Sequence, residues 1–198
     1  MTTYANRGMN LESLIEYANA RYRANGVAIV EKQNTKFIPL RNQYTKQINS
    51  CKVEKKATVD FMGRYKTIPV AIEAKHTKTN RIRFDAVQNH QAEFLTDFCK
   101  DEQGFGAVLV SYNMERFFLV PWEFWKAGRT SWEKYKGKYR HAVMKYGVDW
   151  KPPGKASVSA DELPQEFEVK INNKYGLAYL SKIDTYIAFR NVSIKKEV

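Results

Sequence analysis

The feature that most constrains the fold is a short apolar strand that runs directly into charged residues. The sequence of residues 59–78 is VDFMGRYKTIPVAIEAKHTK, in which an apolar run ends at Ile72 and is followed by Glu73 and Lys75. Side chains alternate along a strand, so Glu73 and Lys75 share one face. Charged groups at the end of a half-buried strand are costly unless something uses them. This stretch therefore predicts a functional site at the end of the strand.

A second carboxylate is expected close to Glu73 if the stretch is a hairpin. A two-residue turn at Lys66 and Thr67 places Asp60 opposite Glu73, with Cβ atoms about 5 Å apart. Two carboxylates this close repel each other unless a cation lies between them, and Lys75 is one step further along the same face. Mg²⁺ prefers carboxylate oxygens together with water and substrate phosphate. The hairpin thus predicts a magnesium site with a neighbouring ammonium that can orient water or offset charge.

Spacing alone leaves two alternatives open. Lys-Thr is not a preferred hairpin turn, and a slip of the turn toward Gly63 would separate Asp60 from Glu73. Lys75 could also form an ordinary salt bridge with either carboxylate on a solvated face.

The rest of the chain predicts an α/β fold in which a central mixed sheet is flanked by helices. A helix is expected over residues 10–25, with Asn10 as its N-cap and Gly26 at its end. A second helix is expected over residues 85–101, and a short one from Trp122. Strands are expected at residues 27–30, 107–111 and 116–120, and residues 177–189 return to an ordered apolar pattern. The element order αβββαβ supports the α/β class.

Two segments depart from this pattern. Residues 36–57 interleave basic and apolar side chains, with too few apolar residues for a core, and we expect an extended projection or loose hairpin, here called the stalk. Residues 130–175 are rich in Lys, Tyr and Gly, and we expect an irregular insertion. The 198 residues suffice for one substantial core, so residues 1–198 are expected to form a single domain.

The charge balance favours a polyanionic partner. The chain has 33 Lys and Arg against 21 Asp and Glu, a net charge of +12, and nucleic acid is the usual partner of such a protein. Cys51 and Cys99 are isolated and the three histidines lack zinc-ligand spacing with them. The sequence contains no apolar run that approaches the length of a membrane span. We therefore expect a cytoplasmic protein that binds DNA and has no membrane partner.

Several stretches together resemble a known family. The order Asp60…Glu73-Ala74-Lys75 resembles the PD-(D/E)XK nuclease signature, which is short and common. The similarity becomes specific with YANRGMNLE at residues 4–12, VDFMGRY and IEAKHTK in the hairpin, FDAVQNHQAEFL at 84–95 and GLAYLSKIDTYI at 176–187. Together they look like the RecU-type Holliday junction resolvases over residues 4–125 and again from Gly176. Residues 130–175 have no recognised counterpart.

The resemblance implies a restriction-endonuclease-like nuclease domain that works in DNA recombination and repair. It implies a homodimer, Mg²⁺ with Mn²⁺ as a substitute, and paired symmetric cuts in four-way DNA junctions. By motif, Asp60, Glu73 and Gln91 would bind the metal and Lys75 would assist the attacking water. Thr58, shortly before the metal-binding Asp, completes the catalytic set. Gln91 also lies among apolar helix residues, where a polar side chain needs a hydrogen-bond partner.

The resemblance further implies where DNA is bound. Residues 36–57 occupy the position of the family's stalk, which projects toward the junction centre, and Arg7 falls in the N-terminal motif. Glu12, in the same motif, is left open between a solvated side chain and a part in the metal site. The expected DNA-binding residues are Arg7, Arg41, Lys46, Lys52, Lys55, Lys56 and Lys78.

Two alternatives to a junction resolvase remain. The same nuclease core could cut other duplex or branched DNA, or the protein could bind DNA without cutting it. The Asp-Glu-Lys set disfavours a non-catalytic binder, because carboxylates beside phosphates weaken binding unless a metal bridges them.

Overall fold

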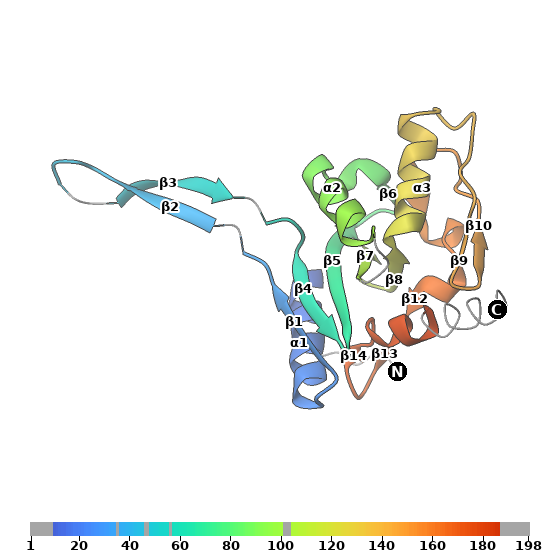
Figure 1. Ribbon diagram of the computed structural model, residues 1–198, viewed down its shortest axis with the longest axis horizontal. Coiled ribbons are helices and arrows are strands. Elements are labelled where there is room, and N and C mark those ends of the chain that lie inside the picture. Colours follow the sequence, from blue (N-terminus) through green and yellow to red (C-terminus); the bar gives the residue numbers. More distant parts are fainter. Residues whose placement is uncertain (1–9, 35, 46–47, 56, 101–103, 187–198) are drawn as a thin grey trace.

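A mixed sheet with helices on its flanks forms the centre of the computed structural model (Figure 1). The structure describes residues 10–34, 36–45, 48–55, 57–100 and 104–186. The strands of the central sheet are β1 (Ala28–Lys32), β4 (Phe61–Tyr65), β5 (Ile68–Thr77), β7 (Phe105–Tyr112), β8 (Arg116–Pro121) and β12 (Glu168–Val169). Within the described residues their order is β1-β4-β5-β7-β8-β12, with β5 and β7 parallel and the other neighbours antiparallel. The predicted α/β class and mixed sheet are confirmed.

The helices begin and end for local reasons. Within the described residues they are α1 (Leu11–Ala24), α2 (Asn89–Phe98) and α3 (Trp122–Glu133), and residues 181–186 are also helical. The Asn10 side chain accepts a hydrogen bond from the Ser13 backbone N–H at 2.8 Å, which caps α1 as predicted. Gly26 follows α1 with φ +65°, a conformation that suits glycine at a helix end. Among the described residues, no helix has both the length and the apolarity needed to cross a membrane.

The second helix is shorter than the predicted span of residues 85–101. A short 3-10 helix, η2 (Phe84–Ala86), precedes it, and Val87 and Gln88 then adopt extended backbone conformations with ψ of 112° and 160°. Two extended residues break the helical hydrogen-bond ladder, so α2 starts only at Asn89. Val87, which precedes α2, and Leu95, which lies within it, are both fully buried. The apolar pattern therefore continues across this break.

The hairpin of β4 and β5 has the predicted register. Tyr65 pairs with Ile68 and Phe61 with Ile72. Lys66 takes φ +53° at the turn, which supplies the left-handed conformation although lysine is not a preferred turn residue. Gly63 lies within β4, where an added Cβ would come within 1.9 Å of the Ile29 carbonyl oxygen. The slip toward Gly63 is therefore wrong.

The stalk is an antiparallel pair, β2 (Lys36–Arg41) and β3 (Ile48–Lys55). It extends away from the rest of the molecule (Figure 1) and its strands contact chiefly each other. Since β1 pairs with β4, the chain from β1 through β4 is one long hairpin whose far half is the stalk. The register shifts between Lys36 and Phe37 and between Leu40 and Arg41 interrupt the ladder.

The segment over residues 130–175 contributes to the core. Its short strands are β9 (Val143–Lys145), β10 (Val148–Trp150), β11 (Ser157–Ser159), β12 and β13 (Ile171–Asn172), with 3-10 helices η3 (Ala160–Glu162) and η4 (Gln165–Phe167). β12 extends the central sheet, β13 pairs with β14 (Gly176–Leu177), and Val158 and Phe167 are fully buried. Sequence patterns missed these strands because each has only two or three residues.

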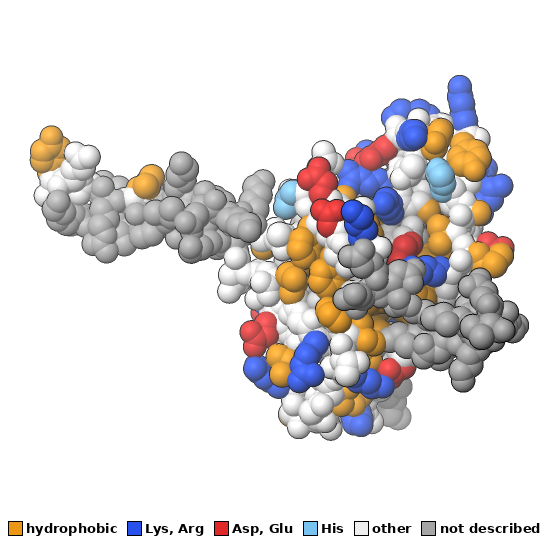
Figure 2. Space-filling view, viewed as in Figure 1, with side chains coloured by type: hydrophobic (Ala, Val, Ile, Leu, Met, Phe, Trp, Pro, Cys, Tyr) orange, Lys and Arg blue, Asp and Glu red, His pale blue; other side chains and the backbone are white. Residues whose placement is uncertain are grey.

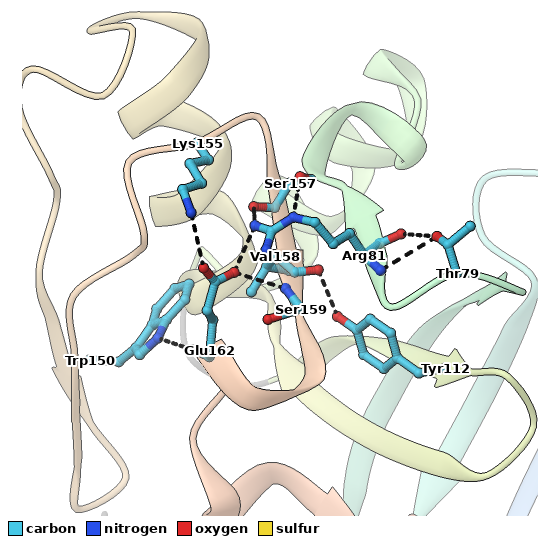
Figure 3. A network of polar contacts seen from close by, with 9 residues as sticks. All are labelled: Thr79, Arg81, Tyr112, Trp150, Lys155, Ser157, Val158, Ser159 and Glu162. Atoms are coloured by element: carbon cyan, nitrogen blue, oxygen red, sulfur yellow. Dashed lines mark hydrogen bonds and ion pairs between the residues drawn. The ribbon is translucent and has the colours of Figure 1, made fainter.

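A polar network fastens this segment to the strand that follows β5 (Figure 3). β11 pairs with β6 (Arg81–Arg83), which lies in a stretch without a predicted element. Arg81 Nη2 donates to Glu162 Oε2 at 2.7 Å and to the Ser157 carbonyl oxygen at 2.7 Å. The Ser159 backbone N–H also donates to Glu162 Oε2, at 3.0 Å. The network therefore holds β11 and η3 against β6.

Candidate active site

Asp60 and Glu73 lie at the point where the ladder between β4 and β5 ends. The last pair is Phe61 with Ile72, one step short of the two carboxylates. Asp60 Oδ2 accepts a hydrogen bond from the Ala74 backbone N–H at 2.8 Å, which holds this half-buried side chain over the end of β5. The Asp60 carbonyl oxygen accepts from the Gln33 backbone N–H at 2.7 Å, just beyond β1. The hairpin thus brings the two carboxylates together.

Glu73 is fully buried and asymmetrically bonded. Its Oε1 accepts from Lys75 Nζ at 2.5 Å and from Gln91 Nε2 at 2.7 Å. Its Oε2 is buried and has no hydrogen-bond partner among the described residues. A buried oxygen without a partner is unusual in a folded protein and points to a ligand.

The environment raises the pKa of Glu73 to about 7. Burial is the largest cause, because it disfavours the charged form, and the nearby Asp60 carboxylate adds to it. The Lys75 ammonium opposes both effects. The ion pair between Lys75 and Glu73 is not the solvated salt bridge that spacing left open. The Lys75 side chain is only 21% exposed and that of Glu73 is not exposed at all.

Gln91 joins the site from the first turn of α2. Its side chain is buried, and Gln91 Oε1 accepts from the Gln88 backbone N–H at 2.9 Å while Nε2 donates to Glu73. The partner expected for this polar side chain is therefore Glu73. Its predicted role as a metal ligand stays a prediction, and the contacts show that it orients Glu73. Gln88 was missed; the Gln-x-x-Gln spacing of a helix start could have indicated it.

Thr58 and Glu12 are less closely tied to the carboxylates. The half-buried Thr58 has its hydroxyl 3.8 Å from Met62 Sδ, a weak contact, and its catalytic role stays a prediction. Glu12 forms an ion pair with Lys32 at 2.8 Å. Lys32 is the β1 residue paired with Phe61, so this ion pair lies at the same end of the sheet as Asp60.

The residues present fit a divalent cation. The described residues contain no cluster of three or more Asp, Glu, His or Cys side chains with metal-site spacing, so Asp60 and Glu73 stand as a carboxylate pair. Mg²⁺ is commonly held by one or two carboxylates, with water and substrate phosphate completing its coordination. The unpartnered Oε2 of Glu73 and the repulsion from Asp60 are what a cation would relieve.

The predicted DNA-binding residues are distributed over the stalk and the end of β5. Arg41, Lys52 and Lys55 lie in the stalk strands. Lys78 is exposed directly after β5. The other three, Arg7, Lys46 and Lys56, lie outside the described residues.

Comparison with known proteins assigns the chain to a family. It matches the model of the family described as Recombination protein U over residues 6–185. It is 28% identical over 195 residues to the Holliday junction resolvase RecU of Lactobacillus delbrueckii subsp. bulgaricus, covering 95% of this chain and 84% of that protein. The Holliday junction resolvase RecU of Staphylococcus aureus is 26% identical over 147 residues, 71% of this chain and 68% of that protein. The solved structure of Hjc, a Holliday junction resolvase from Archaeoglobus fulgidus, aligns with TM-score 0.33 and 11% identity over 56% of this chain and 74% of that chain. The family match spans most of the chain, and this protein therefore belongs to the RecU family.

Proposed function

We propose that this protein is a Mg²⁺-dependent endonuclease that resolves Holliday junctions. The observation that carries the proposal is the buried Glu73 beside Asp60 and Lys75, in a chain of the RecU family. One of its carboxylate oxygens has no hydrogen-bond partner in the part of the chain that the structure describes. The named relatives from Lactobacillus and Staphylococcus are Holliday junction resolvases. Mn²⁺ is expected to substitute for Mg²⁺, since both prefer oxygen ligands.

Each residue has a distinct part in the proposed reaction. Asp60 and Glu73 would hold the cation, which when bound would lower the pKa of a water molecule and offset charge on the scissile phosphate. Gln91 fixes the Glu73 carboxylate through its hydrogen bond to Oε1. Lys75, adjacent to the same oxygen, is placed to orient the attacking water and to offset charge in the transition state.

The carboxylates argue against a protein that only binds DNA. Asp60 and Glu73 add negative charge where a phosphate would approach, and the burial of Glu73 has an energetic cost. A pure binding surface gains nothing from such a pair. A metal-dependent hydrolase needs it.

The proposal includes a homodimer that makes paired, symmetric cuts. A four-way junction has near two-fold symmetry, and a two-fold dimer with one site per subunit is the simplest way to cut opposite strands. We further propose a single nuclease domain of the restriction-endonuclease type that acts in the cytoplasm, with the stalk as the element that recognises the branch point.

The test is a cleavage assay on two substrates. The full-length protein is incubated with a labelled four-way junction and with a linear duplex of matched sequence, with and without Mg²⁺. We expect paired nicks in the junction only with Mg²⁺, and little cutting of the duplex. Equal cutting of both substrates would favour a nuclease acting on other DNA, and binding without cutting under all conditions would exclude the enzyme.

A further inference from the structure

A loop that follows α3 carries a concentrated positive charge. It comprises residues 134–140, is here called the basic loop, and contains Lys134, Lys136, Lys138 and Arg140 without an acidic residue. All four cationic side chains are exposed. Lys and Arg side chains also gather over this end of the molecule in Figure 2. The loop lies in the segment that sequence resemblance did not explain.

These cations have no carboxylate partners among the described residues. The nearest acidic residue in sequence, Glu133, is paired with Arg129 at 2.8 Å. Lys134 and Lys136 instead lie over aromatic rings, 5.2 Å from the centre of Tyr135 and 5.7 Å from that of Trp132. Elsewhere on the described surface, exposed cations such as Arg23 and Lys170 face carboxylates. The charge of the basic loop is therefore available to an external anion.

The loop has a fixed shape. The backbone N–H groups of Lys136, Gly137 and Lys138 donate to the carbonyl oxygens of Trp132, Ser131 and Tyr135 at 2.8–2.9 Å. Gly137 has φ +78°, and a Cβ there would come within 2.0 Å of the Gly154 carbonyl oxygen. The close approach to Gly154 packs the loop against the next segment of the chain. The four cations are thus presented in a defined arrangement rather than on a frayed helix end.

The aromatic residues of the loop favour phosphate binding over base stacking. Tyr139 is 57% exposed, but its ring contacts Tyr135 and His141 edge-on at 5.3 and 5.0 Å between centroids. Single-stranded DNA is held by bases that stack on free aromatic faces. Here the rings pack on one another, while the cationic side chains of the loop are exposed to solvent. Duplex DNA, which presents a regular row of phosphates, is the partner this chemistry fits.

We infer that the basic loop is a second DNA-binding surface that contacts the phosphates of a duplex arm. In Figure 1 the end of α3 lies at the opposite side of the molecule from the stalk, with α2 between them. Duplex DNA is stiff over about 150 base pairs, so an arm that leaves the branch point continues in a straight line past the body of the protein. This inference rests on the proposed function for the identity of the duplex as a junction arm, and only for that.

The test compares two variants with the same net charge. One combines Lys136→Asn, Lys138→Gln and Arg140→Gln; asparagine is chosen because residue 136 has φ +49°. The control combines Arg23→Gln, Arg83→Gln and Lys170→Gln, three exposed cations that each have a carboxylate partner. Binding of the full-length proteins to linear duplex and to four-way junction is measured between about 50 and about 200 mM salt.

The measured quantity is the slope of the logarithm of the binding constant against the logarithm of the salt concentration. For both DNAs, we expect this slope to be shallower than wild type by about 2 to 3 in the loop variant and to change by less than about 1 in the control. Equal salt dependence in the two variants would overturn the inference. A Tyr139→Ser variant that weakens binding to single strands more than to duplex would also overturn it. Failure of wild type to cleave a junction would refute the proposed function and leave the duplex measurement valid.

Discussion

At the scale of residues, Glu73 determines the properties of the site. It is a fully buried carboxylate with Lys75 and Gln91 on one oxygen and no partner among the described residues on the other. The folded protein holds its proton more tightly than the unfolded chain does, because the pKa rises from an ordinary 4.5 to about 7. Without metal, folding therefore becomes less favourable as the pH rises between these two values.

Replacing Glu73 by glutamine should abolish cleavage and stabilise the metal-free protein above neutral pH. The isosteric amide removes a buried charge whose pKa shift corresponds to about 3 kcal/mol as an upper value. We expect the gain in unfolding free energy at about pH 8 and almost none at about pH 4, where the wild-type side chain is mostly protonated in both states. Denaturant unfolding in EDTA measures it, with the exposed Glu115→Gln as control. Added Mg²⁺ should stabilise wild type but not Glu73→Gln; stabilisation of both would contradict the ligand role.

Replacing Lys75 by alanine should slow cleavage by about a hundredfold or more, the typical loss for one transition-state donor. Lys75 also lowers the pKa of Glu73, so its removal weakens metal binding at low pH. The loss of the transition-state donor can be distinguished from weaker metal binding at about pH 8.5 with saturating Mg²⁺. Under these conditions Glu73 is ionised whether or not Lys75 is present. Single-turnover rates under these conditions should still show the loss, and Lys170→Ala should not. Full recovery would assign Lys75 a purely electrostatic role on Glu73.

The sequence was sufficient to place Asp60, Glu73 and Lys75 together. Alternation along β5 and the hairpin register determine their relative positions, and both follow from local rules. The contact of Gln91 with Glu73 depends on how α2 packs against β5, and no local pattern specifies that distance. The sequence also did not predict the hydrogen bond between Asp60 and the Ala74 backbone. The strand ladder ends one residue earlier than a regular hairpin predicts.

At the scale of elements, the stalk is the far half of the β1–β4 hairpin. Its strands pair with each other and leave the pairing of β1 with β4 intact at the base. The stalk can therefore be removed without cutting into the sheet. This separation allows its role to be tested independently of the catalytic residues.

Replacing residues 36–55 by a short Gly-Asn-Gly-Ser linker should abolish the preference for junctions. Duplex affinity should fall only by the share of phosphate contacts that the stalk makes, because the remaining basic surface persists. The measurement is the ratio of junction to duplex dissociation constants at one salt concentration, with circular dichroism to confirm folding. A basic segment that only adds attraction would lower both affinities by the same factor.

The Arg81–Glu162 contact should make the attachment of the 130–175 segment sensitive to acid. Burial raises the pKa of Glu162, but hydrogen bonds from the Ser159 backbone and from Arg81 outweigh it and leave the pKa below its ordinary value. A lowered pKa means that stability is present above about pH 4.5 and is lost as the pH falls through the folded value. Glu162→Gln should cost about 1 kcal/mol at about pH 7 and less at about pH 3. Urea unfolding at the two pH values measures this loss. The neighbouring Asp161 has a side chain that is 75% exposed, so Asp161→Asn should have less effect. An equal loss from Glu162→Gln at both pH values would argue against the ion pair.

Among the elements, periodicity predicted the long ones and missed the short ones. α1, β7 and β8 have clear patterns and lie where the sequence placed them. β6 and β11 have three residues each and exist only because they pair with each other. Their partners are far apart in the chain, so no window of sequence shows the pairing. The break before α2 arises from two extended residues within a continuous apolar pattern.

At the scale of the whole molecule, charge and symmetry determine how DNA would be engaged. The net charge of +12 provides general attraction to DNA. Basic residues lie on the stalk, at the end of β5 and on the basic loop, so these are the parts of the molecule that we expect to face DNA. One active site per chain cannot make two symmetric cuts at once. Paired cutting therefore requires a second copy.

Light scattering should show a mass of twice 23.1 kDa at the concentrations used for cleavage. The physical reason is the two-fold symmetry of the junction, which a closed dimer matches with one site on each side. Mixing wild type with excess Asp60→Asn should produce junctions nicked on one strand only. A monomeric mass together with complete resolution would contradict the dimer.

The continuous hairpin from β1 to β4 also has an evolutionary consequence. Insertions or deletions near its tip change only the length of the stalk, because β2 and β3 contact chiefly each other. Two residues added to each strand lengthen it by about 7 Å and keep every side chain on its face, whereas a single added residue reverses the faces beyond it. Asp60, which lies outside the stalk and is held by Ala74 and Gln33, stays in place throughout. Proteins that evolve from this chain can thus differ in the length of the stalk while the active-site residues keep their positions.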